Sequence, residues 1–370
     1  MGTTIVRSAD SPREFRRFVD FAYEINATDP HWIPELRLSA RERLTAKKNP
    51  FFAHADVQLL LAWRDDVLVG RIAAIDDRLH NETHRDNAAM FGFFEAVDGE
   101  AARALLEAAE SWARARGRAA VRGPINPSMN ESVGLLVDGF DTDPMLLMPR
   151  NPPAYAGYIE AAGYTKAKDL YAWMYDLRRG VPETIARVAD RLRTRLNISV
   201  GPLNVKDFYR EAERLREIYC SAWQQNWGFV APTPEEFRRI ASEMKPIFDA
   251  RCTVAAQVDG RMIACAVAVP DVNQVLKGTD GRLTLSTIWR LLRRHRYIDQ
   301  ARLLLFGIDA RYRQSGLYPL MIAQLHRQAA PFYKRIEFSW ILEDNRDINQ
   351  PAERAGAERY QTYRVYQKTL

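Results

Sequence analysis

The order of secondary-structure elements repeats along this chain, and that repetition limits the possible folds more than any other feature of the sequence. In the first half, a short strand over residues 3–8 and an amphipathic helix over 12–25 precede two strands over 57–75 that are hinged at Asp65-Asp66. The second half repeats this order about 194 residues later, with a strand over 198–205, a helix over 207–223 and a hairpin over 252–269.

The two halves also end alike. Gly163 follows Asn151 by twelve residues, Gly356 follows Asn345 by eleven, and an aromatic strand comes after each glycine. Two unrelated α/β segments can share such features by chance, but four matched elements in one order favour a duplicated domain. The Gly/Pro break RRGVPE separates the halves. We therefore predict two α/β (α+β mixed sheet) domains, over residues 1–178 and 179–370.

Composition and charge narrow the class of protein. The 370 residues are 47% hydrophobic and 27% charged, which fits a soluble globular protein rather than a disordered one. No apolar run is long enough to span a bilayer, the first ten residues lack the apolar core of a signal peptide, and three cysteines show no metal spacing. We expect a cytoplasmic protein without a metal. Its net charge of +6 favours an anionic partner, namely a phosphorylated cofactor, a membrane surface or nucleic acid.

The stretch IDARYRQSGLYPLMIAQL, residues 308–325, reads as a strand end, a basic turn and a helix that begins near Leu317. The free amides of the first helical turn point back at this turn, where Gly316 lets a ligand approach closely and Arg311 and Arg313 add positive charge. Such a corner suits a phosphate. An ordinary structural corner would look the same in isolation, but the following strand and the helix after Asn345 favour the phosphate site.

These residues resemble the GNAT superfamily of acyl-CoA-dependent N-acyltransferases. The phosphate loop of that family reads Gln/Arg-x-x-Gly-x-Gly/Ala after its fourth strand; Arg313 and Gly316 match the first two positions, while Tyr318 occupies the third. Ala352 stands where many members carry a Tyr that protonates the leaving thiolate. The resemblance implies acyl-CoA as co-substrate, no metal, and a cofactor-binding set of Phe306, Gly307, Ile308, Arg311, Arg313, Gln314, Ser315, Gly316, Leu317, Tyr318 and Asn345.

The first half resembles the same fold without its cofactor site. NPPAYAGYIEAAGY keeps Asn151, Tyr158 and Gly163 in the arrangement of the family. The preceding segment over 93–117 has no Arg-x-x-Gly and is acidic where phosphates would lie. The resemblance therefore implies that residues 179–370 bind acyl-CoA and that residues 1–178 help to shape the acceptor site.

More narrowly, the chain resembles the GNAT-type bacterial ceramide synthases through the segments GPINPSMNESVGLLVDGF, WQQNWGFVAPTPEEF and LKGTDGRLTLSTIWRLLRRHR. That resemblance implies transfer of a fatty acyl group to the amine of a long-chain amino lipid such as a sphingoid base. Three alternatives stay open. They are an N-acetyltransferase of a small polar amine, a non-catalytic acyl-CoA or lipid-binding protein, which Ala352 allows, and an aminoacyl-tRNA-dependent ligase, which the phosphate loop disfavours.

Amide formation needs a base that takes a proton from the ammonium form of the amine. Glu343 follows the strand beside the cofactor strand and is the candidate, with a solvated strand-end carboxylate as the structural alternative and Asp138 as a rival base. Tyr366 or Tyr363 would protonate the thiolate, although aromatic strand residues also serve as core. Gly307, inside an apolar strand, marks either a bulge whose amide faces the oxyanion or a relief of packing.

The amide-rich loop GPINPSMNESVGLL supplies candidates for binding the polar head of the acceptor, unless its Asn side chains only stabilise a turn. These candidates are Asn126, Asn130, Glu131 and Asp138. The segments DPMLLMP and NWGF would line a tunnel for an acyl or lipid chain, or else belong to the ordinary core.

A basic amphipathic helix with a Trp is predicted over residues 285–296. It predicts peripheral attachment to an anionic membrane surface at the inner membrane face; a helix packed on its own domain with a solvated basic face is the alternative. No recognition fold or stacking motif indicates nucleic acid. The apolar residues are Leu285, Ile288, Trp289 and Leu292, and the arginines are Arg290, Arg293, Arg294 and Arg296.

Overall fold

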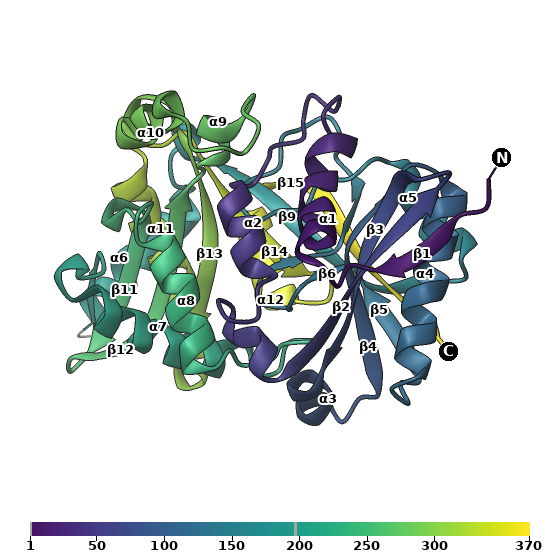
Figure 1. The fold of residues 1–370 in the computed structure, drawn as a ribbon. Helices are drawn as coiled ribbons and strands as arrows, with labels where there is room; N and C mark the ends of the chain where they lie inside the picture. Colours follow the sequence, from purple (N-terminus) through teal and green to yellow (C-terminus); the bar gives the residue numbers. More distant parts are fainter. Residues whose placement is uncertain (1, 196–197) are drawn as a thin grey trace. The chain divides into compact units, whose positions relative to one another are not determined.

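The computed structural model describes residues 2–195 and 198–370, and these form two compact units (Figure 1). Unit 1 draws on three stretches of the chain, Met1–Leu170, Leu276–Thr287 and Gln361–Leu370. Unit 2 consists of Tyr171–Val275 and Ile288–Tyr360. The units therefore do not follow a single cut in the sequence, because the C-terminal residues belong with the N-terminal ones.

Unit 1 contains a mixed sheet. The two-residue turn between its second and third strands has positive φ at Asp65 (49°) and Asp66 (61°), as a tight hairpin requires. The strands β1 (Ile5–Ser8), β2 (Ala55–Arg64), β3 (Val67–Asp77) and β4 (Ala88–Ala96) pair antiparallel in this order. β4 pairs in parallel with β5 (Ala120–Gly123), which in turn pairs antiparallel with the C-terminal part of β15 (Glu358–Thr369).

The helices of unit 1 are α1 (Pro12–Ile25), α2 (Arg37–Arg43), α3 (Arg78–His84), α4 (Gly99–Arg114) and α5 (Ala154–Ala161). A capping box starts α1, since Ser11 Oγ accepts from the Glu14 amide at 3.2 Å and the Glu14 carboxylate accepts from the Ser11 amide. Three short strands follow β5: β6 (Ile125–Asn126), β7 (Ser132–Val133) and β8 (Leu135–Asp138).

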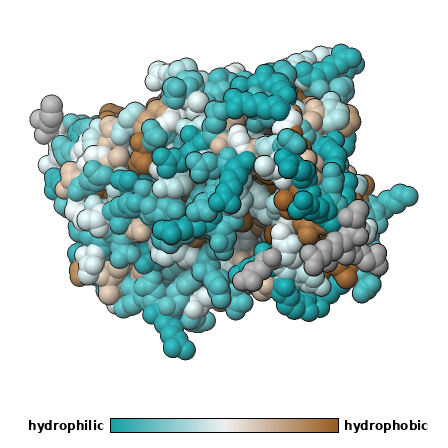
Figure 2. Space-filling model, turned by 180° about the vertical axis from the view of Figure 1, so that it is seen from behind, coloured by the Kyte–Doolittle hydropathy of each residue, from teal (hydrophilic) through white to brown (hydrophobic). Residues whose placement is uncertain are grey.

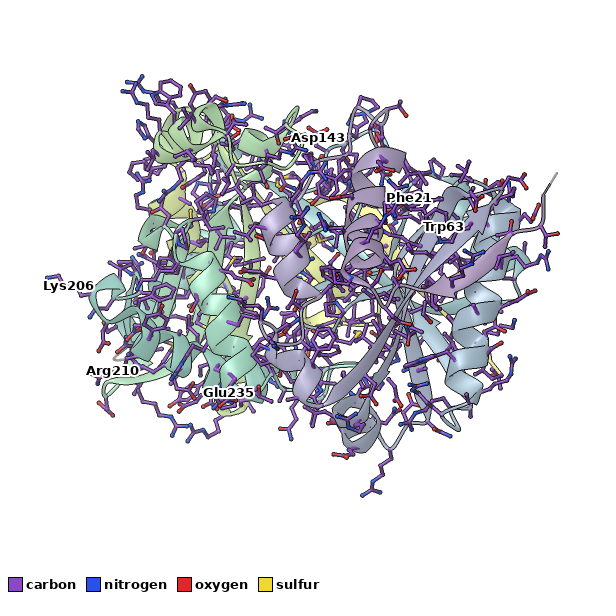
Figure 3. All side chains as sticks on the ribbon, in the orientation of Figure 1. Phe21, Trp63, Asp143, Lys206, Arg210 and Glu235 are labelled. Carbon is purple, nitrogen blue, oxygen red and sulfur yellow. The ribbon has the colours of Figure 1, made fainter. Side chains whose placement is uncertain are left out.

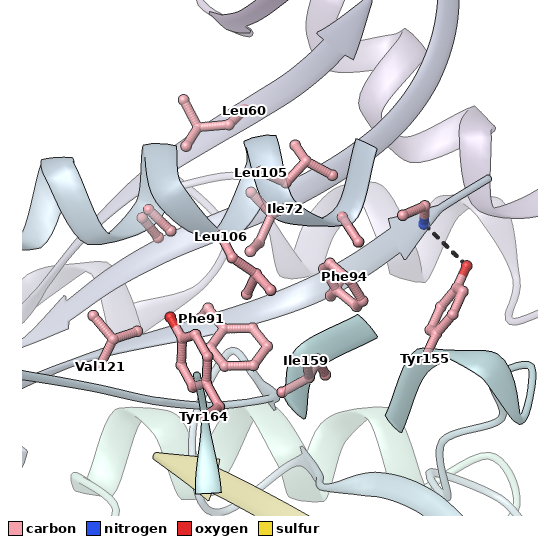
Figure 4. Close-up of a cluster of buried hydrophobic side chains, with 14 of the residues drawn as sticks. Leu60, Ile72, Phe91, Phe94, Leu105, Leu106, Val121, Tyr155, Ile159 and Tyr164 are labelled. Atoms are coloured by element: carbon pink, nitrogen blue, oxygen red, sulfur yellow. Dashed lines mark hydrogen bonds between the residues drawn. The ribbon is translucent and has the colours of Figure 1, made fainter. Parts of the chain in front are cut away.

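The core of unit 1 lies between the sheet and helices α4 and α5 (Figure 4). Leu105 and Leu106 of α4 are fully buried against Ile72 and Phe91 of the sheet. The Tyr155 hydroxyl accepts a hydrogen bond from the Ala96 amide at 3.0 Å, so a buried backbone group at the end of β4 keeps a partner.

The strands of unit 2 follow one another and pair in the same order as those of unit 1. β10 (Ser199–Gly201), β11 (Thr253–Val258), β12 (Arg261–Pro270) and β13 (Gln300–Ile308) pair antiparallel in sequence, and β14 (Arg335–Leu342) pairs in parallel with β13. Half of β9 (Thr165–Asp176) also belongs to this unit. The helices that lie wholly in unit 2 are α6 (Glu183–Arg195), α7 (Phe208–Trp223), α8 (Pro234–Met244), α11 (Leu317–Ala329) and α12 (Arg346–Arg354). Two more helices extend into the stretch Leu276–Thr287 of unit 1, namely α9 (Asn273–Leu276) with its last residue and α10 (Leu285–Leu292) with its first three.

The mixed α/β fold and the elements predicted from the hydrophobic pattern are confirmed, including both hairpins and the start of α11 at Leu317. One helix is shorter than predicted. α10 ends at Leu292, and a 3-10 turn over Arg294–Arg296 replaces its last turn. The face of the molecule shown in Figure 2 is mostly hydrophilic, with hydrophobic side chains in small patches.

Candidate active site

In unit 2, the parallel strands β13 and β14 separate. Their pairing runs from Gln300–Arg335 to Leu303–Phe338 and then stops, although β13 continues to Ile308 and β14 to Leu342. The register between β12 and β13 shifts at the same level, so that Leu304 is an extra residue in β13. The result is a fork between two strands, in which residues 304–308 of β13 lie beyond the described pairing with β14.

Gly307 lies in the fork strand but not at the bulge. It pairs in regular register with Cys265 of β12. A Cβ at this position would lie 2.8 Å from Ile218 Cγ2 and 3.3 Å from Ala222 Cβ, both on α7. This geometry supports the packing interpretation of the glycine, because a side chain would push α7 away from the sheet. Phe306, its neighbour, accepts from Trp223 Nε1 through its carbonyl at 3.1 Å.

A buried ion pair lies where the fork begins. Arg302 and Glu337 are register partners, with Arg302 Nε 3.3 Å from Glu337 Oε1, and both are almost completely buried. Ser339 and Tyr360 hydroxyls donate to the Glu337 carboxylate, and burial raises its pKa. The pair fixes the two strands to each other just before they diverge, and the charge of each partner is compensated.

The helix after β13 begins without a side-chain cap. Gly316 precedes α11 with φ of +79°, a left-handed conformation that favours glycine, and as the N-cap residue it has no side chain that could bond to the first amides of the helix. Among the described residues, the atom nearest to a Cβ there would be Leu192 Cδ1, at 3.5 Å. A helix N-terminus whose capping residue has no side chain is of the kind that can bind an anion.

The arginines of the loop are already engaged. Arg311 pairs with Asp309 through Nη2 at 2.8 Å, and this hydrogen bond holds the pKa of Asp309 at about 2. Arg313 is exposed and donates to the carbonyls of Ser221 and Ala222 at 3.3 and 3.0 Å. No carboxylate among the described residues forms an ion pair with Arg313, whereas the charge of Arg311 is balanced by Asp309.

Unit 1 differs from unit 2 both at the start of its corresponding helix, α4, and between its corresponding parallel strands, β4 and β5. Asp98 caps α4, accepting from the Ala101 amide at 2.9 Å, and Arg64 lowers the pKa of this carboxyl by hydrogen bonding. Asn126 follows the paired part of β4 and β5, and its side-chain oxygen accepts from the Phe93 amide at 2.5 Å. In unit 1, the carboxylate of Asp98 therefore occupies the start of α4. The side chain of Asn126 bonds to β4 beyond the point where β4 and β5 pair.

The remaining sequence candidates lie in different surroundings. Glu343 is half-buried directly after β14, at the same sheet end as Ile308, because β13 and β14 run in parallel. Asn345 precedes α12 without a side-chain cap. Tyr366 is a fully buried member of the unit 1 core, with its hydroxyl 3.0 Å from Glu160 Oε1. Tyr363 is buried in the same unit and donates to Gln361.

Of the acceptor candidates, Glu131 makes an ion pair with Arg43 at 3.0 Å. The Asn130 amide bonds to Ser128 Oγ. Asp138 is exposed at the end of β8, opposite Thr362. Asn126 differs from these three, because it also lines a cavity in unit 1.

That cavity encloses about 190 Å³. It lies among α1, α2, β3, β4 and the loops around β6–β8, and its charged lining residues are Glu35, Arg43, Arg71, Glu95 and Arg150. Arg71 and Glu95, cross-strand partners in β3 and β4, were not singled out from the sequence. The sequence does indicate them, because each is a charged residue within an otherwise apolar strand, VLVGRIAAI for Arg71 and MFGFFEA for Glu95.

No group of His, Cys, Asp and Glu residues suited to a metal occurs among residues 2–195 and 198–370. No protein-family model matches the chain. The bacterial ceramide synthase of Caulobacter vibrioides is 38% identical over 374 residues, which are 97% of this chain and 96% of that protein. Protein YghO of Escherichia coli K12 is 34% identical over 378 residues, 99% of this chain and 95% of its own length.

Solved structures show the fold. A tandem GNAT protein from the clavulanic acid biosynthesis pathway superposes with a TM-score of 0.58 at 14% identity, over 100% of this chain and 98% of its own. A GCN5-related N-acetyltransferase from Sphaerobacter thermophilus reaches 0.51 at 11% identity, over 99% and 95% of the two chains. The predicted tandem GNAT fold is thus confirmed, and the chain belongs to the family of GNAT-fold acyltransferases that includes the bacterial ceramide synthase.

Proposed function

We propose that the protein transfers a fatty acyl group from acyl-CoA to the amine of a long-chain amino lipid such as a sphingoid base, and that its second half binds the acyl-CoA. The contrast between the two helix starts is the observation that supports this assignment most. α11 begins after Gly316, which has no side chain to cap its first amides, whereas α4 is capped by the carboxylate of Asp98. Only the former suits a pyrophosphate.

Bound acyl-CoA would supply an activated thioester. The amides from Ser315 to Tyr318 would hold its phosphates, Arg313 would add charge, and the open edge of β13 beyond Leu303 would receive the extended arm. Glu343 would take the proton that the amine must lose before it attacks. The amine nitrogen forms a bond to the acyl carbon and the bond between that carbon and the sulfur of CoA breaks. The second proton that the nitrogen loses balances the leaving thiolate, so the products are the amide and the thiol form of CoA.

The exposed side chains of α10 support the proposal that the protein binds to the surface of an anionic membrane. The side chains that a helix of a soluble protein ordinarily buries are exposed here; Leu285 is 88% and Leu292 76% accessible, and Trp289 is also exposed. Arg293 lies 4.8 Å from the Trp289 ring centre, and Arg290, Arg294 and Arg296 flank the same turns. No helix in the part of the chain that the structure describes is long and apolar enough to cross a membrane.

Thiol release tests the proposed function. The protein is incubated with acyl-CoAs of increasing chain length and with either a sphingoid base or small polar amines, and the product is identified by mass. We expect thiol release only with the long-chain amine and preference for a fatty acyl chain. Release with acetyl-CoA and a small amine would instead support an N-acetyltransferase. CoA binding without release by any amine would support a non-catalytic binding protein.

A further inference from the structure

We infer that Trp223 is a gate in the acyl-CoA site, because its indole N–H occupies a backbone carbonyl that the extended arm of the cofactor would use. This inference rests on the proposed function and adds how the fork between β13 and β14 admits the arm. Trp223 Nε1 donates to the carbonyl of Phe306 at 3.1 Å. That carbonyl belongs to the stretch of β13 beyond Leu303, where the described pairing with β14 has ended.

The carbonyl of Phe306 points into the fork. β12 and β13 are antiparallel, and in such a pair alternate residues direct both of their backbone groups at the partner strand. The Asp309 amide donates to the Ile263 carbonyl at 2.8 Å, so Asp309 and Gly307 direct their backbone groups at β12. Phe306 and Ile308 therefore direct theirs at the opposite side, where β14 lies along the earlier part of β13. A ligand that adds to this edge of β13 would donate an amide N–H to the Phe306 carbonyl.

Phe306 also lies between the proposed phosphate site and the point where the fork begins. Its ring packs on Tyr318 in the first turn of α11, with 5.1 Å between the ring centroids. Leu303, the last residue of β13 that pairs with β14, lies earlier in the same strand. CoA has its phosphates near one end, its thiol at the other and amide N–H groups between them. An arm that runs along β13 from the phosphates towards the start of the fork therefore passes Phe306.

Trp223 closes the fork on the side of α7. It is the last residue of this helix, which packs on β13 at Gly307. The exposed Arg210 near the start of α7 and Glu235 at the start of α8 are labelled in Figure 3. While its Nε1 is bonded to β13, the indole of Trp223 contacts Trp340 of β14, with ring centroids 5.8 Å apart. One side chain thus reaches both strands of the fork.

The indole can leave this position without opening the core. Trp223 is half-buried and ends its helix, so the connection over residues 224–233 follows it directly. The rings of Tyr219 and Phe229 pack against it, with centroids 5.1 and 6.2 Å away. A hydrogen bond between two neutral groups is modest in net strength, so an amide N–H of the ligand can replace it. The contact therefore closes the empty fork and yields to the arm of CoA.

The indole N–H signals of the full chain in NMR spectra test the gate. The chain contains 8 Trp residues, and the signal that is missing from Trp223→Phe belongs to Trp223. On addition of CoA this signal should shift and lose its protection from solvent exchange, because the bond to Phe306 is broken. ADP carries a pyrophosphate but no arm, so it should leave the signal unchanged. An equal change with ADP would overturn the inference, because the phosphates alone would then move Trp223.

Calorimetry with CoA gives a second measurement. Trp223→Phe keeps an aromatic ring but loses the N–H that competes for the Phe306 carbonyl, so CoA should bind about fivefold more tightly than to the wild type. Trp112→Phe, the same change on α4 of unit 1, should bind CoA as the wild type does. If Trp223→Phe does not fold, Trp223→Leu also lacks the N–H and serves both measurements.

The outcomes separate the gate from the proposed function. CoA binding to the wild type without a change in the Trp223 signal refutes the gate alone, as does equal or weaker CoA affinity in Trp223→Phe. Absence of CoA binding in both the wild type and Trp223→Phe refutes the proposed function and the gate with it.

Discussion

Gly316 and Asp98 stand at matching helix starts, and one residue decides whether the first amides are available. Gly316→Glu places a carboxylate and a strained left-handed residue where phosphates would approach, so CoA affinity should fall by about tenfold or more, to the point of no measurable binding. Calorimetry with CoA measures it. Gly99→Glu at the start of α4 is the matched control and should bind CoA as wild type does. A folded Gly316→Glu protein with normal CoA affinity would refute the phosphate site.

Glu343 is half-buried at the sheet end where the fork opens. If it is the base, Glu343→Gln should lower turnover about 100-fold or more with little loss of CoA affinity, because the amide cannot take a proton. Turnover should recover at high pH, where free amine accumulates. Steady-state rates across pH check this. Near-normal turnover would transfer the role to Asp138, Glu131 or a water relay.

His80 makes the stability of unit 1 depend on pH. Burial, with His84 and Arg122 nearby, lowers its pKa to about 4, and Arg122 donates to its Nε2 at 3.3 Å. In the unfolded chain the imidazole of His80 takes up a proton near pH 6.5, whereas in the folded protein it does so only near pH 4. The unfolded state therefore binds more protons between these two values, and the free energy of unfolding, which is not reduced by His80 above pH 6.5, falls as the pH drops towards 4. His80→Gln should flatten this dependence in urea unfolding, whereas His295→Gln, on the surface, should not. An unchanged slope in His80→Gln would contradict the assignment.

Single residues also show where sequence reasoning reached its limit. The sequence indicates Gly316 because it stands directly before a predicted helix and beside two arginines, and the strand and helix that follow favour a phosphate site. It does not indicate the role of Gly307, because its neighbour Ile218 comes from a distant helix. Arg71 and Glu95 were visible as charges in apolar strands, but their pairing depends on the register of β3 and β4, which the sequence alone does not give.

At the scale of elements, helices and hairpins followed from periodicity and turn residues, because these are local properties. The partner of a strand is not local. The aromatic pattern of β15 predicts a strand, yet nothing in it indicates that Tyr366 pairs with Gly123 of β5 and joins the core of unit 1. Tyr366 was a candidate acid for the thiolate, and the structure places it among buried side chains with Glu160.

The exposed helix α10 should bind anionic membranes. We expect the protein to sediment with anionic but not neutral liposomes, because its apolar residues insert and each arginine near the surface contributes about 1 kcal/mol. Salt should weaken binding, as should replacement of Arg290, Arg293, Arg294 and Arg296 by Gln. Trp289→Ala should weaken it even at low salt.

The matched control removes the same charge elsewhere on the surface, by replacing Arg187, Arg191, Arg210 and Arg238 with Gln. It should sediment nearly as the wild type does, since a general loss of charge would not remove the apolar contact. If the wild-type protein ignores anionic liposomes at low salt, α10 has another role, and a small soluble amine becomes the better acceptor.

At the scale of the whole molecule, each unit contains chain from both halves of the sequence. Unit 1 takes Gln361–Leu370, which supply Tyr366 to its core and an ion pair of Lys368 with Glu110 at 2.8 Å. Unit 2 takes Tyr171–Asp176 of β9, from which Tyr175 stacks on Phe338 and bonds to His326 at 2.8 Å. The last strand of each half is thus shared, since the end of β15 belongs to unit 1 and the end of β9 belongs to unit 2.

This exchange predicts how the separated halves behave. Residues 1–178 alone would leave the edge of β5 unpaired and the place of Tyr366 empty, and residues 179–370 alone would lack Tyr175. Neither fragment should unfold cooperatively in thermal melts followed by circular dichroism. Mixed or produced together, they should form a complex that melts cooperatively, because each supplies the missing strand of the other. A cooperative transition for either fragment alone would show that its unit does not need the exchanged strand.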